Sequence, residues 1–520
     1  MKVRVLPWLI AVALALSGCP VGPDFVRPDT KVNATWKEAG AEKLAAPSET
    51  DARWWKAFKD PVLDSLIESA YRQNFDLQAA GVRVMQARAQ LGIATGRIWP
   101  QQQEVGASAM YQHIGLNTPS VAANRQFWDM QAGFDAAWEI DIWGKYRRGI
   151  ESETAGLLAT VASYQGALIS LTAEVARTYV TIRTFEVLLE QAKQNAQVQQ
   201  QGLDIAKARL ASGATSELDV AQATTLLEST LATVPQYQAS LVQSKNALST
   251  LLGQPVGAVD TLLGGSAGGG IPQPPEKMAL GLPAELLRRR PDIRAAELSA
   301  AAQCARIGMA KADLFPSFSI AGAIGYRYAT LGPITGAGPL SNFYYSIGPQ
   351  IHWPFFNYGR LLNAVRVQDA AFQESLMVYR STVLKAAQEV EDNLTGFVNS
   401  RDSLAAQDRS VVSAKRAVEI ALAQYREGAV DYQRVLDAER TLLQQQNAQA
   451  QTSSSVTTNA IALFKALGGG WEVRQGEPLI AEPVQEEMHK RTAWGDVLTE
   501  PRKAEKKAEA ATTNSEAVKP

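Results

Sequence analysis

Four segments of the chain alternate between apolar and polar residues with a period of two. The clearest covers residues 127–141, and the others lie near residues 105–111, 318–328 and 343–353. Side chains of a β-strand point alternately to its two faces, so the pattern predicts four strands. In the strand predicted over residues 127–141, the face opposite the aromatic residues carries four carboxylates, namely Asp129, Asp135, Glu139 and Asp141.

These strands are longer than the roughly five or six residues usual in a soluble sheet. Their length suits a tilted crossing of a bilayer, and apolar-out, polar-in alternation is typical of outer-membrane barrels. The pattern therefore predicts that the four carboxylates line a barrel lumen. A half-buried antiparallel sheet in a soluble domain would alternate in the same way and remains the alternative.

Each pair of strands is followed by a very long helical pattern. Residues 150–211 contain no proline, and apolar residues such as Leu171, Val175 and Tyr179 recur every three or four positions. A helix of that length would extend roughly 90 Å. Residues 212–215 break it and a return helix follows; the second half of the chain repeats this with a break at residues 427–429.

The repetition covers almost the whole chain. The sequence from Phe75 to Pro100 resembles that from Pro291 to Pro316, an offset near 215 that other positions share. We expect two copies of one unit, joined by a linker rich in glycine and proline, and a C-terminal tail whose end lacks large apolar residues and is disordered. The expected boundaries are 57–263 and 284–470 for the copies, 264–283 for the linker and 471–520 for the tail.

Four membrane-length strands cannot close a barrel, because open edges in lipid leave backbone groups unpaired. Two chains would supply eight strands and an interior filled by side chains. Three chains would supply twelve strands and a lumen that hydrates the carboxylates, whose burial without partners is costly. Three chains are therefore favoured.

The N-terminus has the anatomy of an export signal. Residues 1–18 carry Lys2 and Arg4 before an apolar core too short to span a bilayer. They end in a Leu-Ser-Gly-Cys sequence that resembles the bacterial lipobox, which predicts a lipid on Cys19 and an irregular tether over residues 19–56. An ordinary signal peptide with a stray cysteine is the alternative. Pro20 replaces the aspartate that retains such lipoproteins in the inner membrane.

Composition excludes several functions. The net charge of −1 provides no basic surface for nucleic acid. The three histidines are scattered, and the chain has no phosphate-binding loop, dinucleotide fingerprint or nucleophile elbow. We therefore expect neither an enzyme nor a bound metal or cofactor.

Two motifs resemble those of the TolC-like outer-membrane efflux proteins, most closely the lipoprotein subgroup that serves resistance-nodulation-division (RND) pumps. They are LLRRRPDIRAAE at residues 286–297 and YREGAVDYQRVLDA at residues 425–438. The resemblance implies a mainly α fold with membrane β: a homotrimer with a twelve-stranded barrel, a long periplasmic coiled-coil tunnel and a mixed α/β equatorial region. It also implies N-palmitoyl and S-diacylglycerol groups on Cys19.

The implied function is the outer-membrane exit duct of a tripartite pump, reached through a periplasmic membrane-fusion adaptor from an inner-membrane RND transporter. By resemblance, Asp437 lies at the periplasmic aperture, where Arg434 replaces a second aspartate of many relatives. Tyr425 and Asp219 match a pair that holds the aperture shut. A solvated helix face is the alternative for Asp437 and Arg434. The adaptor would dock at the helix tips, at Ser212, Gly213, Ala214, Glu427, Gly428 and Ala429.

Two other functions compete with efflux. A channel of the same fold could serve type I protein secretion, and a tethered coiled-coil lipoprotein could act without a pore. The match to the pump-linked subgroup disfavours the first, and the alternating strands with their carboxylates disfavour the second.

Overall fold

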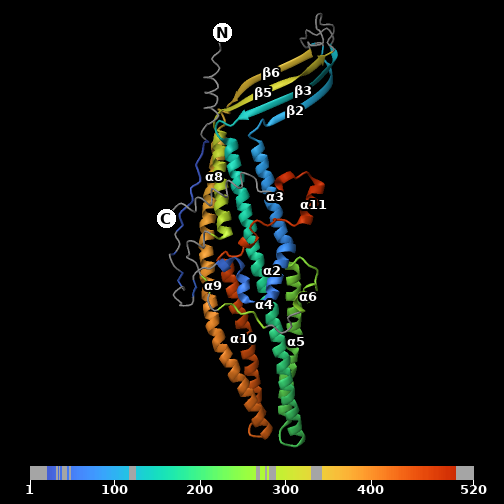
Figure 1. Ribbon diagram of the computed structural model, residues 1–520, viewed down its shortest axis with the longest axis vertical. Helices are drawn as coiled ribbons and strands as arrows, with labels where there is room; N and C mark the ends of the chain where they lie inside the picture. The colour runs from blue at the N-terminus through green and yellow to red at the C-terminus, as the bar shows by residue number, and fades with distance from the viewer. Residues whose placement is uncertain are drawn as a thin grey trace.

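A long bundle of helices carries a four-stranded antiparallel sheet at one end (Figure 1). The computed structural model describes residues 20–30, 33, 36–37, 44–45, 49–115, 117, 125–264, 270–275, 278–279, 289–329 and 342–498. The expected signal peptide, Cys19 and the chain end beyond residue 498 lie outside these residues.

The four expected strands form the sheet in the order β2-β3-β5-β6, each pair antiparallel. Their bounds are β2 Gln102–His113, β3 Gln126–Ile140, β5 Ser317–Ala329 and β6 Phe343–His352. Gly106, Gly133 and Gly325 face one another across three strands. A Cβ on Gly133 or Gly325 would lie 3.1 Å from the hydroxyl of Tyr344, so these two glycines make room for a tyrosine of β6.

Both outer strands of the sheet keep one free edge. Within the described residues, β2 pairs only with β3 and β6 pairs only with β5. The apolar side chains of the sheet are also uncovered in the single chain: Val105, Tyr345 and Ile347 are 86%, 74% and 79% exposed. The sheet is therefore incomplete as a membrane structure.

Two long helical hairpins leave the sheet in the same direction (Figure 1). Their helices are α4 Lys145–Ala211, α5 Glu217–Leu251, α9 Arg360–Glu427 and α10 Tyr432–Ala466. Both first helices begin after a glycine with positive φ, Gly144 at 77° and Gly359 at 79°. The expected long helices, their breaks and their duplication are thus confirmed. α4 is long and apolar enough to cross a membrane by composition, but it packs against α3, α5, α8 and α10.

Shorter helices surround the upper and middle parts of the bundle. Asn74 separates α2 from α3, and its side-chain oxygen accepts from the Leu77 amide at the start of α3. The α-helices are α2 Pro61–Gln73, α3 Phe75–Gly96, α6 Val259–Leu263, α8 Pro291–Ala312 and α11 Glu482–Arg491. The 3₁₀ turns are Glu49–Phe58, Glu472–Arg474 and Gly495–Val497. Two short strands, β1 Leu44–Ala45 and β4 Met278–Ala279, pair in parallel.

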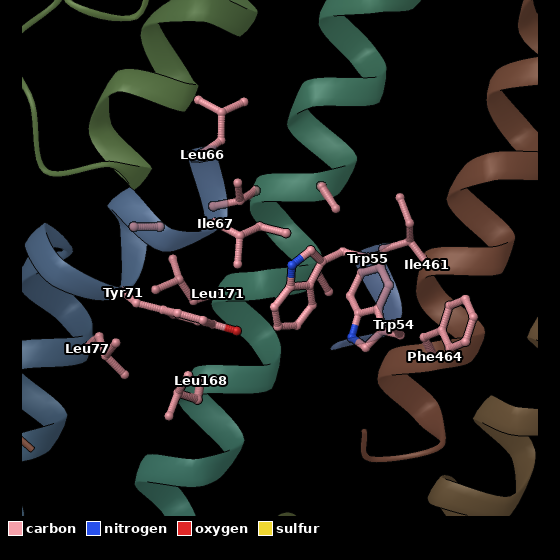
Figure 2. Close-up of a cluster of buried hydrophobic side chains, with 14 of the residues drawn as sticks. Trp54, Trp55, Leu66, Ile67, Tyr71, Leu77, Leu168, Leu171, Ile461 and Phe464 are labelled. Carbon is pink, nitrogen blue, oxygen red and sulfur yellow. The ribbon is translucent and has the colours of Figure 1, made fainter. Parts of the chain in front are cut away.

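The core at mid-height contains an aromatic cluster (Figure 2). Trp54 stacks on Phe464 of α10 with ring centroids 5.2 Å apart, and it meets Trp55 edge to face at 5.8 Å. Trp55 in turn contacts Tyr71 of α2. Both tryptophans are 2% exposed. The expected tether over residues 19–56 is therefore more than a connector, since its end belongs to the core.

The described part of the C-terminal tail also packs on the body. Arg474 donates to the carbonyl oxygen of Tyr71 at 2.7 Å. A Cβ on Gly81 of α3 would lie 2.3 Å from the carbonyl oxygen of Leu479, so the tail approaches α3 backbone to backbone. Ile480 and Met488 are buried in the same core. Residues 471–498 thus pack against α2 and α3 near the middle of the bundle.

Candidate functional site

The two hairpin tips lie side by side at the end of the bundle opposite the sheet (Figure 1). α4 ends at Ala211 and α9 at Glu427, and each is followed by a glycine in the left-handed region, Gly213 at φ 74° and Gly428 at φ 83°. Glycine adopts this conformation without steric cost, so it ends both helices at equivalent points of the two copies.

The structure brings Tyr425 and Asp219 together across the two hairpins. The hydroxyl of Tyr425 donates to Oδ2 of Asp219 at 3.1 Å, and the hydroxyl of Thr215 bonds the same carboxylate oxygen. Tyr425 is 1% exposed, and burial raises the pKa of its phenol. The phenol therefore stays protonated at neutral pH and can act as the donor. We call this pair the latch.

Arg209 of α4 reinforces the latch. Its guanidinium carbon lies 4.6 Å from the centroid of the Tyr425 ring, and Nη1 donates to the backbone carbonyl of Tyr425. A cation over an aromatic face is attracted by the ring electrons. The same cation is attracted by the partial negative charge of the last carbonyls of a helix. Sequence reasoning missed Arg209, although a basic residue in the last turn of a helix is a recognisable signal.

Asp437 and Arg434 lie on the exposed face of α10. Asp437 accepts from the side-chain amide of Gln433 at 2.9 Å, and it makes no ion pair with Arg434 within the described chain. Both charges are thus available to a partner outside the protomer. Their role at an aperture stays a prediction.

The expected docking residues form the outer surface of the tips. All six are exposed: Ser212, Gly213, Ala214, Glu427, Gly428 and Ala429. Beside them, Leu218 of α5 is 63% exposed. The tips therefore offer a surface with little side-chain bulk, and whether an adaptor uses it stays a prediction.

The four carboxylates of the β3 pattern have different surroundings. Asp129 forms a two-point ion pair with Arg327 of β5, with oxygen–nitrogen distances of 3.0 and 2.6 Å. Asp135 is exposed and lies opposite Glu104 in the register. Their place in a lumen stays a prediction.

The other two carboxylates, Glu139 and Asp141, accept hydrogen bonds at the junction between β3 and α4. Glu139 accepts from the hydroxyl of Tyr146 at 3.0 Å. Asp141 lies one residue beyond the end of β3, where its carboxylate accepts from the backbone amides of Tyr146 and Arg147. A carboxylate at this place stabilises the first turn of α4. Asp141 therefore belongs to the start of the helix, and the strand predicted over residues 127–141 ends one residue earlier, at Ile140.

The first described residues are fixed against the same junction. The amide of Val21 donates to the carbonyl of Trp143 at 3.0 Å, and buried Arg148 binds Asp24 at 2.7 Å. Gly22 and Gly308 of α8 approach so closely that a Cβ on Gly22 would lie 2.5 Å from Cα of Gly308. We call this contact the N-terminal clasp. It places Pro20, and hence the chain after Cys19, beside the base of the sheet.

Replacing Gly308 with alanine should release the clasp. The new Cβ would lie 2.7 Å from the carbonyl oxygen of Val21 and 2.8 Å from Cγ of Arg148, so one of them must move. We expect faster proteolysis within residues 20–30, measured by limited digestion and mass spectrometry. Gly156→Ala is the control, because its Cβ would meet no atom within 4 Å. Equal cleavage rates in both variants would contradict the prediction.

A four-stranded sheet with free edges joined to two long helical hairpins is the architecture expected of a TolC-like outer-membrane channel. The chain belongs to the outer membrane efflux protein family, which it matches over residues 66–254 and again over residues 282–469. Each copy of the duplication therefore corresponds to one unit of the family. The protein is an efflux channel and not an enzyme.

Relatives cover nearly the whole chain. It is 33% identical to the pyoverdine export outer membrane protein OpmQ of Pseudomonas putida, over 89% of this chain and 97% of that protein. It is 30% identical to the cation efflux system protein CusC of Escherichia coli K12, over 90% and 99%. The structure of the outer-membrane channel OprN superposes with a TM-score of 0.80 at 33% identity, over 87% and 100%. These names support efflux over protein secretion.

Proposed function

We propose that three copies of this chain form the exit duct of a tripartite RND-type efflux pump. The observation that carries the proposal is the sheet with two free edges and an uncovered apolar surface. Three such sheets give twelve strands, a number that can enclose a water-filled lumen, whereas eight strands leave an interior filled by side chains. Asp135, which is exposed in the single chain, would then face water in that lumen.

In this trimer the helical hairpins would extend the barrel as a periplasmic tunnel. The latch would keep the tips closed, and Asp437 with Arg434 would face their symmetry mates around the aperture. An adaptor would dock on the exposed tips and draw them apart, and the inner-membrane transporter would supply the energy. We expect the duct itself to conduct without a bound metal or cofactor.

We further propose that Cys19 carries N-palmitoyl and S-diacylglycerol groups. The N-terminal clasp supports this, because it fixes Pro20 beside Gly144, immediately below the sheet. Lipid chains on the preceding residue would enter the inner leaflet beside the barrel. The cargo is left open, since the two relatives named above are named for pyoverdine and for cations.

Two measurements on the full-length protein test the proposal. Chemical crosslinking in intact cells, followed by mass spectrometry, should yield a trimer with an adaptor attached at the tips; an attached ATP-driven exporter would instead support secretion. In planar bilayers the purified protein should conduct ions, and Asp437→Ala should raise the conductance by removing aperture carboxylates. Absence of conductance in both forms would exclude a channel.

A further inference from the structure

One carboxyl group lies on the buried face of α10, just above the latch. Val435, Leu436 and Leu442 of this face pack into the bundle, and Glu439 stands among them with only 4% of its surface exposed. A charged side chain buried to this extent normally has a partner.

The space beside Glu439 is bordered by α4 and α10. A Cβ on Gly202 of α4 would lie 3.7 Å from Oε1 of Glu439 and 3.3 Å from the hydroxyl of Tyr432, so both oxygens border the space that this glycine leaves. Gln199 lies one turn above Gly202 on the same helix and is 2% exposed. Its Oε1, the Tyr432 hydroxyl and both Glu439 oxygens find no hydrogen-bond partner among the residues that the structure describes.

Among the described residues, no charged side chain forms an ion pair with Glu439, and burial is the cause of its raised pKa. From α4, Gly202 borders the site, and the basic Arg209 lies two turns lower against Tyr425. α5 contributes Asp219 to the latch, and α9 contributes Tyr425. Burial alone raises the pKa of Glu439 to about 7. A proton is therefore the occupant that fits: it removes the charge and gives the carboxyl a donor.

The site contacts the latch through two aromatic rings. Tyr432, whose hydroxyl borders the Glu439 site, packs edge to face on Tyr425 with centroids 5.2 Å apart. Tyr425 in turn donates to Asp219. The order Glu439, Tyr432, Tyr425, Asp219 thus runs from the buried carboxyl to the bond between the two hairpins.

We propose that Glu439 is a proton-binding site that favours the closed tips when it is protonated and favours their separation when it is ionised. Separation of the hairpins would admit water to the carboxylate, which stabilises the charged form. The inference rests on the proposed gate at the tips and adds proton control to it.

The direction of the pH effect follows from linkage. With the hairpins bonded as in the structure, burial raises the pKa of Glu439 to about 7, and in water this pKa would return toward its ordinary value of 4.5. The closed state therefore binds more protons between these values and is lost as the pH rises through that range. For one carboxyl the ratio of closed to open tips falls by up to about tenfold per pH unit.

The test compares the full-length assembled protein with Glu439→Gln in planar bilayers between about pH 5 and pH 8. The wild-type open fraction should rise with pH. In the variant, the isosteric and neutral glutamine side chain should keep the tips closed and remove that rise. Glu228→Gln, at an exposed position of α5, is the matched control and should retain it. Infrared spectra should show a protonated carboxyl at acidic pH that Glu439→Gln lacks.

The outcomes separate this inference from the proposed function. Opening in Asp219→Ala together with identical pH curves for wild type and Glu439→Gln would overturn the proton site and keep the channel. Absence of conductance in every variant, Asp219→Ala included, would overturn the channel itself. A pH response that persists in Glu439→Gln but disappears in Glu228→Gln would also overturn the assignment to Glu439.

Discussion

Replacing Asp219 with alanine should convert a mostly closed channel into one that opens without a partner. The change removes the acceptor of the Tyr425 hydroxyl and also the partner of Thr215. A hydrogen bond to a charged group contributes about 1.5–3 kcal/mol, and the lower end applies because Asp219 is only half-buried. Each lost latch then shifts the open-to-closed ratio about tenfold. In a trimer the three shifts act together.

Single-channel recording in planar bilayers measures this effect. Tyr425→Phe should act in the same direction but less strongly, because it keeps the ring under the Arg209 guanidinium. Glu217→Ala removes a carboxylate at an exposed position of the same helix and should leave the open fraction unchanged. If Asp219→Ala and Glu217→Ala behaved alike, the latch would have no part in closure.

Trp54→Ala is expected to destabilise the folded chain more than any of the substitutions at the hairpin tips. The side chain is 2% exposed and touches Trp55 and Phe464 (Figure 2). It also meets Phe58 edge to face. Truncation of a buried tryptophan to alanine costs about 3–5 kcal/mol, because the lost contacts leave a cavity that neighbours fill only in part. The free energy of unfolding should fall by that amount, measured by denaturant titration of the purified protein.

Phe75→Ala provides the comparison for this substitution. Phe75 begins α3 and is 70% exposed, so its truncation should change the free energy of unfolding by less than about 0.5 kcal/mol. A loss for Trp54→Ala no larger than for Phe75→Ala would mean that the aromatic cluster does not stabilise the bundle.

The parts of the fold that could be predicted from the sequence are those with a regular spacing of apolar residues. Alternation over 127–141 predicted β3 to within a residue at each end, and the proline-free run predicted α4. The latch pair was predicted by resemblance and is bonded in the structure. Trp54 was missed as a core residue because it lies in a 3₁₀ turn without a repeating pattern. Its burial depends on α10, some 400 residues later in the chain.

Glu439 could have been found from the sequence. Tyr432, Val435, Leu436 and Leu442 recur at helical spacing, and Glu439 interrupts their apolar face. Its significance, however, needs Gly202, which is distant in the chain and has no side chain to suggest a contact. Asp141 was misread for the opposite reason: its polar character fits the strand alternation, but its carboxylate serves the helix that follows.

The hairpin helices of the two copies have nearly equal lengths, 67 and 68 residues before the turns and 35 residues after each. Equal rods that start from one sheet end at one level, so six tips in a trimer would present a flat rim. A three- or four-residue insertion in α4 alone would move one tip about 5 Å further from the sheet and rotate its exposed face. Length changes in these helices should therefore have been tolerated in evolution only when both copies changed together.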